Sequence, residues 1–222
     1  MSKPLAVVLL SGGMDSALCA SIASLEYTLA FLHIQYGQRT AKKELECFKK
    51  LCHFFNPHKV LIAEAPFLKD IGGSSLTNEN LPIPEGNQEG IPSTYVPFRN
   101  GIFLSIATAW AETLGAKKIF IGVNQRDFSG YPDCRETFIK AFNRAILEGT
   151  KPETQIQIET PLMNLSKKEI VELGIKLNTP FELTWSCYKE NDIACGKCSS
   201  CKLRLKAFNE AGIKDPIPYS ER

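Results

Sequence analysis

The stretch Ser11-Gly12-Gly13-Met14-Asp15-Ser16 follows an apolar run at 5–10 and precedes a helix-like run at 17–23. This order predicts a strand, a glycine turn and a helix. Two glycines let the backbone turn sharply and approach a ligand closely. The free N–H groups of such a turn, together with the positive end of the helix, form an anion site. The predicted phosphate-binding loop consists of Leu10, Ser11, Gly12, Gly13, Met14, Asp15 and Ser16.

This loop differs from two common phosphate-binding patterns. G-x-x-x-x-G-K-[ST] requires a lysine after its glycines, and neither that lysine nor the G-x-G-x-x-G pattern is present. Ser11 and Ser16 add hydroxyl donors, and Asp15 could position either a metal ion or the loop itself. An ordinary serine–glycine turn is the alternative, but the strand before, the helix after and the position of Asp15 favour a phosphate site.

Composition restricts the class of protein. The chain has 222 residues, is 44% hydrophobic and carries 26 basic against 24 acidic residues. We therefore expect one α/β domain with a small appendage, and no nucleic-acid partner. The apolar run at 5–10 is too short for a signal peptide, and no stretch is long enough to span a bilayer. A cytoplasmic protein without a membrane partner is expected, whose eight cysteines are thiols or metal ligands.

Strand and helix patterns alternate along the chain. Strands are predicted at 28–35, 59–63 and 118–123, and helices at 42–55, 99–114, 133–147 and 167–177. Repeated βα units indicate a doubly wound parallel sheet covered on both faces, with ligands at the carboxyl ends of its strands. We expect the loops at 11–16, 35–39 and 124–133 to lie there.

Two segments interrupt this pattern. Residues 64–95 are rich in Pro, Gly, Asn and Ser and lack a regular period, which is typical of a lid or a subunit arm. The predicted division is a main α/β domain at 1–180, with residues 181–222 forming a C-terminal zinc-binding segment packed on it.

The C-terminal segment contains a tight C-x-x-C-x-x-C run. Cys195, Cys198 and Cys201 form it, and Cys187 lies eight residues upstream. Four thiolates satisfy tetrahedral zinc, and a site whose ligands all come from the protein is structural. An iron–sulfur cluster shares part of the spacing, but the fourth cysteine precedes the run and no C-x-x-x-C-P follows. A disulfide pair is not expected in a cytoplasmic protein.

Two basic residues stand where helices begin. Arg99 could hold a carboxylate or a phosphate through two hydrogen bonds, while the neighbouring Asn100 could simply cap the helix. Lys167 follows Ser166, which with Glu169 forms a capping pattern, and it could also reach the phosphates. The candidate catalytic residues are Asp15, Ser16, Arg99 and Lys167.

The loop at 127–135 combines charge, aromatic rings and a thiol directly after a predicted strand. A flat heterocycle could stack on an aromatic ring here while a carboxylate accepts its N–H donors; a turn with Asp133 as helix cap is the alternative. Cys134 could be a nucleophile, but no histidine lies near it in sequence. The candidate substrate-binding residues are Asp127, Phe128, Tyr131, Asp133 and Arg135.

The pattern S-G-G-x-D-S resembles the PP-loop of ATP pyrophosphatases, which split ATP into AMP and pyrophosphate. Further segments extend the resemblance to the 7-cyano-7-deazaguanine synthases of queuosine-precursor biosynthesis. They are VPFRN at 96–100, GVNQRDFSGYPDCR at 122–135, ETPLMNLSK at 159–167, TWSCY at 184–188, CGKCSSC at 195–201 and DPIPY at 215–219. YPDCR together with the four cysteines is the specific part of this match.

The resemblance implies a PP-loop α/β fold, a homodimer and one structural Zn2+ per chain. It also implies that 7-carboxy-7-deazaguanine, ammonia and two ATP become the nitrile, two AMP and two pyrophosphates, with Mg2+ bridging the phosphates. A PP-loop enzyme that modifies tRNA is the first alternative, although no basic extension is evident at net charge +2. A zinc-ribbon binding module without activity is the second, although the cysteines occupy only the tail.

Overall fold

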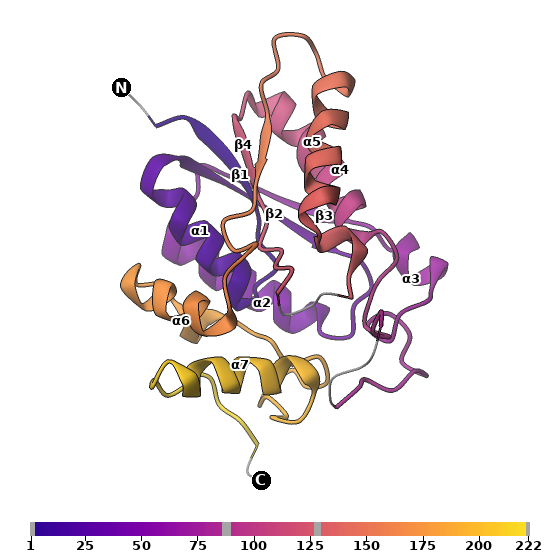
Figure 1. Ribbon diagram of the computed structural model, residues 1–222, viewed down its shortest axis with the longest axis vertical. Helices are drawn as coiled ribbons and strands as arrows, with labels where there is room; N and C mark the ends of the chain where they lie inside the picture. The colour runs from indigo at the N-terminus through magenta and orange to yellow at the C-terminus, as the bar shows by residue number, and fades with distance from the viewer. Residues whose placement is uncertain (1–2, 86–89, 127–129, 221–222) are drawn as a thin grey trace.

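The computed structural model describes residues 3–85, 90–126 and 130–220 (Figure 1). These residues form a five-stranded parallel sheet in the order β3-β2-β1-β4-β5. The strands are β1 (Leu5–Leu9), β2 (Thr28–Gln35), β3 (Lys59–Glu64), β4 (Lys118–Phe120) and β5 (Gln157–Glu159). The strand order reverses between β1 and β4, and in doubly wound sheets ligands bind at the carboxyl ends of the strands beside such a reversal.

Helices connect the strands and cover both faces of the sheet. In the described part of the chain they are α1 (Met14–Glu26), α2 (Ala41–Phe55), α3 (Phe67–Ile71), α4 (Arg99–Leu114), α5 (Glu136–Gly149), α6 (Lys167–Lys176) and α7 (Ser199–Glu210). Short 3₁₀ turns at Pro132–Cys134 and Phe181–Leu183 precede α5 and the cysteine segment. Figure 1 shows α6 and α7 side by side below α1, while α4 and α5 lie to the right of β1 and β4.

The central strand β1 contributes side chains to two hydrophobic cores, one on each face of the sheet. Val7 and Leu9 point into a cluster that includes side chains of α4 and α5. Ala6 and Val8 point to the opposite face, into a cluster with α1, α2, α6 and α7. A strand buried on both faces is expected to be a continuous apolar run, because successive side chains alternate between the faces.

The expected doubly wound α/β fold is confirmed, and most boundaries agree within two residues. The strand expected at 118–123 ends at Phe120, and β5 was missed because three residues carry too little pattern. The helix expected from 133 begins at Glu136, after the 3₁₀ turn. Gly115 ends α4 as expected, in the left-handed conformation that favours glycine, with φ of 67°.

The segment at 64–95 contains a short helix, α3, where no regular structure was expected. Its Ser74, Ser75 and Leu76 are buried, and Leu76 accepts a backbone hydrogen bond of 3.0 Å from Arg39. Among the described residues, no helix is both long enough and apolar enough to cross a membrane.

Candidate active site and metal centre

The glycine turn lies between β1 and α1, where its conformation requires glycine. Gly12 has φ of 93°, and a Cβ added there would lie 2.7 Å from the backbone oxygen of Glu44 on α2. A larger residue would therefore be strained and would also collide with α2. The segment just after β4 also approaches the turn closely, since a Cβ on Gly122 would lie 3.1 Å from the backbone of Asp15.

Hydrogen bonds of Ser11 and Ser16 stabilise the conformation of the glycine turn. The hydroxyls of Ser11 and Ser16 lie 3.1 Å apart, and Ser16 donates to the backbone oxygen of Gly13 at 3.0 Å. Gly13 is the N-cap of α1, and no side-chain hydrogen bond caps this helix within the described chain. The amino end of α1 thus presents backbone N–H groups beside the turn, which is the arrangement expected of an anion site.

Lys167 lies at the first position of α6, and its ammonium group lies 2.7 Å from the Asp15 carboxylate. Ser166 caps α6 in a complete capping box with Glu169, as its spacing predicted. Ser166 therefore caps the helix, whereas the side chain of Lys167 extends to the glycine turn and pairs with Asp15. Both Asp15 and Lys167 line the cavity described next.

A cavity of about 280 Å³ opens from the glycine turn. Its wall includes Arg99 of α4, Tyr131 and Cys134 from the loop before α5, and Lys167. The structure thus brings together predicted residues that are far apart in sequence, such as Asp15 and Lys167, which are 152 positions apart. Such a concave site with few polar groups converging on it is typical of small-molecule enzymes.

Arg99 is a positive charge in this wall, and no carboxylate of the described residues forms an ion pair with it. Its Nη1 donates to the Tyr36 hydroxyl at 3.3 Å and its Nη2 to the Asn100 side-chain oxygen at 3.4 Å. Its buried Nε has no partner among the described residues, and no ion pair involves Arg99 there. The guanidinium also lies 5.6 Å from the Tyr36 ring. A shielded cation of this kind is suited to an anionic ligand.

The loop before α5 is tied to the beginning of α4. Asp133 is buried, and its Oδ2 accepts a hydrogen bond of 2.9 Å from the backbone N–H of Asn100. Asn100 does not cap α4; Phe98 is the N-cap, and the Asn100 amide instead lies 3.3 Å from Cys134 Sγ. Nor does Asp133 cap α5, because Arg135 is its N-cap. The hydrogen bond from Asn100 to Asp133 therefore links the beginning of α4 to the loop before α5, and both segments contribute residues to the cavity wall.

The remaining loop residues differ in where they lie. The Tyr131 hydroxyl lies 2.6 Å from that of Thr94. Arg135 is exposed and is absent from the cavity wall, as is Asp133. Burial raises the pKa of Cys134 to about 12, so that its thiol is protonated and weakly nucleophilic at neutral pH. Asp127 and Phe128 lie outside the described residues.

The cavity wall also includes residues that were not assigned a role from the sequence. Tyr36 lines the cavity from the β2–α2 connection, Glu44 from the first turn of α2, and Trp185 from the C-terminal segment. The backbone N–H of Trp185 donates to Gly12 at 2.9 Å, which attaches that segment to the glycine turn. Trp185 entered the sequence argument only as part of the TWSCY segment, two residues before Cys187, whereas Glu44 resembles any charged residue of an amphipathic helix.

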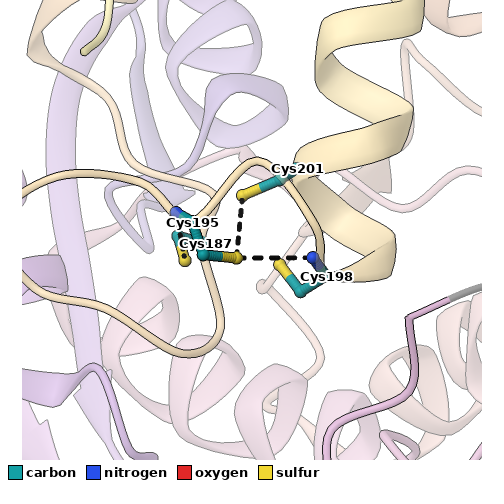
Figure 2. A group of neighbouring side chains, drawn as sticks. All are labelled: Cys187, Cys195, Cys198 and Cys201. Atoms are coloured by element: carbon teal, nitrogen blue, oxygen red, sulfur yellow. Dashed lines mark hydrogen bonds between the residues drawn. The ribbon is translucent and has the colours of Figure 1, made fainter. Parts of the chain in front are cut away.

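The four predicted metal ligands converge at the beginning of α7 (Figure 2). The sulfur atoms of Cys187, Cys195, Cys198 and Cys201 all lie within 4.8 Å of one another. Tetrahedral zinc with Zn–S of about 2.3 Å needs sulfur atoms about 3.8 Å apart, so this cluster is compatible with the ion.

Backbone donors surround two of these sulfur atoms. The N–H of Glu190 lies 3.3 Å from Cys187 Sγ, and the N–H of Cys198 lies 3.3 Å from Cys195 Sγ. Hydrogen bonds from Cys198 and Cys201 lower the pKa of the Cys187 thiol. N–H donors favour thiolate over thiol, and thiolate is the form that binds metal. All eight cysteines are free of disulfides, as the sequence predicted.

The glycine turn, the cavity and the cysteine cluster can now be compared with known proteins. A family model described as "Queuosine biosynthesis protein QueC" matches residues 5–212. The chain belongs to the QueC family. This membership confirms the resemblance inferred from the S-G-G-x-D-S turn, the YPDCR segment and the four cysteines.

Similar proteins span almost the whole QueC-family chain. A 7-cyano-7-deazaguanine synthase from Nautilia profundicola is 54% identical over 219 residues, covering 98% of this chain and 99% of the relative. Another from Nitratiruptor sp. is 55% identical over 216 residues, covering 96% and 98%.

Two solved structures share the fold of this QueC-family protein. An NMN synthetase from Francisella tularensis matches with a TM-score of 0.53 and 16% identity, covering 96% of this chain and 79% of that one. A predicted subunit of tRNA methyltransferase from Methanocaldococcus jannaschii matches with a TM-score of 0.50 and 16% identity, covering 99% and 93%. At this identity the likeness concerns the fold alone.

Proposed function

We propose that this enzyme converts 7-carboxy-7-deazaguanine, ammonia and two ATP into 7-cyano-7-deazaguanine, two AMP and two pyrophosphates. Relatives that are more than half identical over nearly their full length carry the name of this synthase. The observation that carries the proposal in this chain is the juxtaposition of the glycine turn with Arg99, since both line one cavity. A phosphate site beside a cation that forms no ion pair within the described chain suits ATP and a second, carboxylate-bearing substrate.

The chemistry requires two activations by ATP. A carboxylate resists attack by ammonia because oxide is a very poor leaving group. Its oxygen attacks the α-phosphate of ATP, pyrophosphate departs, and the acyl adenylate then reacts with ammonia to give an amide and AMP. A second ATP adenylates the amide oxygen in the same way. Loss of that oxygen as AMP, with the two amide protons, leaves the nitrile.

The residues around the turn stabilise charge on the departing pyrophosphate. The backbone N–H groups at the amino end of α1 and the Ser16 hydroxyl bind its oxygens, and Lys167 adds positive charge. Asp15 holds the Lys167 ammonium in place at 2.7 Å. Mg2+ carried on ATP would share the phosphate charge at this site. Arg99 binds the substrate carboxylate and aligns it with the α-phosphate.

Recognition of the heterocycle is assigned to the loop at 127–135. We propose that the ring lies near Phe128 or Tyr131, and that Asp127 or Asp133 reads its guanine-like N–H edge. A site built to pair such donors discriminates strongly against rings that lack them. Arg135 would contribute positive charge at the mouth of the site. The engagement of Asp133 with Asn100 favours Asp127 as the direct reader.

The remaining assignments concern the whole protein. We propose one structural Zn2+ per chain on the four cysteines, with residues 1–180 as the catalytic domain and 181–222 as the metal-binding segment. We also propose a cytoplasmic homodimer that acts on small molecules rather than nucleic acid, in which 64–95 serves as a lid or subunit arm. The near balance of 26 basic and 24 acidic residues supports the exclusion of nucleic acid.

Measurement of pyrophosphate release tests the proposed function directly. ATP is supplied with 7-carboxy-7-deazaguanine or with unmodified tRNA, each with and without ammonia. Release that depends on the heterocycle, with nitrile formed only when ammonia is present, is the expected result. Release that depends on tRNA would instead support a tRNA-modifying enzyme.

The two-step scheme predicts that the free amide is itself a substrate. Supplied with ATP, it should give nitrile without ammonia and with one AMP per product instead of two. The reason is that only the second activation remains to be done, and both activations use the same phosphate site. Chromatographic quantification of AMP and nitrile measures this ratio, and an inert amide together with obligatory ammonia would contradict the scheme.

A further inference from the structure

Glu44 is a carboxylate that faces the cavity from the first turn of α2. Its position is unusual because ATP and a carboxylate substrate are anions, and a fixed negative charge repels both. A carboxylate is favourable in such a site only where it meets a cation or a cluster of N–H donors. The reaction proposed above includes one substrate of that kind, which is ammonium.

The connection between β2 and α2 holds the Glu44 side chain rigidly. Gln38 Nε2 donates to Glu44 Oε2 at 2.9 Å, and Thr40 Oγ1 donates to Glu44 Oε1 at 2.8 Å. Gln38 is itself fixed, because its Oε1 accepts from the backbone N–H of Tyr36 at 2.9 Å. Gln38 and Thr40 are buried, with 5% and 3% of their surface exposed. Each carboxylate oxygen therefore keeps lone pairs for a further donor.

The backbone of Glu44 also packs directly on the phosphate loop. Its carbonyl oxygen would lie 2.7 Å from a Cβ on Gly12. Arg99 faces the same cavity, and its charge opposes the burial that raises the pKa of Glu44. A substrate carboxyl held by Arg99 and adenylated beside Gly12 would therefore present its reacting carbon on the Glu44 side of the cavity. The N–H edge of the heterocycle lies on the six-membered ring, remote from that carbon.

We propose that Glu44 is the ammonium-binding group and general base of amide formation, a role that rests on the proposed function. One N–H bond of ammonium breaks, and its proton goes to a Glu44 oxygen. The released electron pair on nitrogen forms the C–N bond with the acyl carbon, and the C–O bond to AMP breaks. A second proton passes from nitrogen to the departing phosphate, leaving the neutral amide, protonated AMP and protonated Glu44.

Burial makes this proton transfer feasible. Burial raises the pKa of Glu44, opposed by its hydrogen bonds with Gln38 and Thr40 and by Arg99. Burial disfavours ammonium equally, so transfer of the proton turns two buried charges into two neutral groups. Among the described residues, Tyr36 on the β2–α2 connection and Cys47 on α2 also interact electrostatically with Glu44, and burial keeps both neutral by raising their pKa values.

The test is Glu44→Gln, which keeps the shape of the side chain but cannot accept the proton. Exchange of pyrophosphate into ATP, driven by the heterocycle without ammonia, should stay within about twofold of wild type. In contrast, kcat/KM for total ammonium near neutral pH should fall by about 10²-fold. The variant must rely on free ammonia, so log kcat/KM should rise with pH at a slope of one until ammonium itself deprotonates. Wild type should be flat over that range.

Two further variants separate this role from a structural one. Glu46→Gln, on the exposed face of the same helix, should match wild type in every measurement. Thr40→Val removes one donor from the Glu44 carboxylate, which raises its pKa further. The acid limb of the ammonium profile should then move to higher pH, whereas loss of packing alone would leave that limb in place.

Other results would overturn the assignment. A raised KM for the heterocycle in pyrophosphate exchange, with ammonium kinetics unchanged, would place Glu44 on the N–H edge instead. A fall in kcat/KM that is equal at every pH, or a wild-type profile that already rises with a slope of one, would exclude a proton-accepting role. Absence of exchange in wild type would overturn the proposed function itself, and the two failures are thereby distinguishable.

Discussion

Replacement of Arg99 by methionine should lower kcat/KM for 7-carboxy-7-deazaguanine by about 10³-fold, because the substrate carboxylate loses its counter-charge in a shielded site. The amide, which is neutral, should be affected far less in its own conversion to nitrile. Parallel assays of pyrophosphate release with the two substrates measure this difference. A larger loss with the carboxylate than with the amide would show that the charge of Arg99 is needed, because a general disturbance of the cavity would affect both substrates equally.

The same variant should not lose stability. The guanidinium forms no ion pair within the described chain, and its Nε is buried without a partner. Removal of an uncompensated buried charge is neutral or stabilising, in contrast with removal of one partner of a pair. Thermal unfolding should therefore show an equal or higher Tm, and Phe103→Leu in the adjacent wall is the control for packing. An equal loss with both substrates would contradict a carboxylate site at Arg99.

The features that were predicted correctly are those that depend on residues close together in sequence. The apolar run at 5–10 followed by Gly12 and Gly13 could scarcely form anything but a buried strand and a tight turn, and the structure confirms both. The capping box at Ser166 was equally evident, because its two partners lie three residues apart. The cysteine cluster also converges as expected, since three of its members lie within seven consecutive residues, 195–201.

Contacts between distant segments could not be predicted in this way. Arg204 has the spacing of an exposed helix residue, yet it is 1% exposed and forms a buried ion pair of 2.8 Å with Asp215. Asp133 was expected to read a ligand or to cap its own helix, whereas its carboxylate binds the backbone of Asn100. In each case the partner is set by packing of separate elements, about which the sequence spacing carries no information.

The same reason explains why Glu44 was missed although the loop that precedes its helix was expected near the site. The connection at 35–39 was expected at the carboxyl ends of the strands, and Gln38 does lie there. Glu44 is placed in the cavity only because α2 packs on Gly12, a contact between elements that are 32 residues apart in sequence. Residues on an amphipathic helix need the tertiary structure before their exposed and internal charges can be distinguished.

Loss of the metal should disorder the wall of the active site as well as the C-terminal tail. Cys187 is two residues from Trp185, which donates its backbone N–H to Gly12 at 2.9 Å and lines the cavity. Zinc at such a site contributes about 10 kcal/mol or more, comparable with the whole stability of a domain. We therefore expect Cys198→Ser to lose zinc and to release Trp185 from its buried position, where it is 5% exposed.

Tryptophan fluorescence with elemental analysis can follow this release. The chain has two tryptophans, so Trp110→Phe leaves Trp185 as the only indole reporter. In that background Cys198→Ser, or chelation of the metal, should shift the emission to longer wavelength and abolish pyrophosphate exchange. Cys52→Ser, at a half-buried thiol of α2 outside the cluster, should retain one zinc per chain and unshifted emission. Full metal content in Cys198→Ser, or stoichiometric iron and sulfide in wild type, would contradict the zinc assignment. An unshifted emission after zinc removal would instead show that contacts other than the metal site, such as that with Gly12, keep Trp185 in the cavity wall.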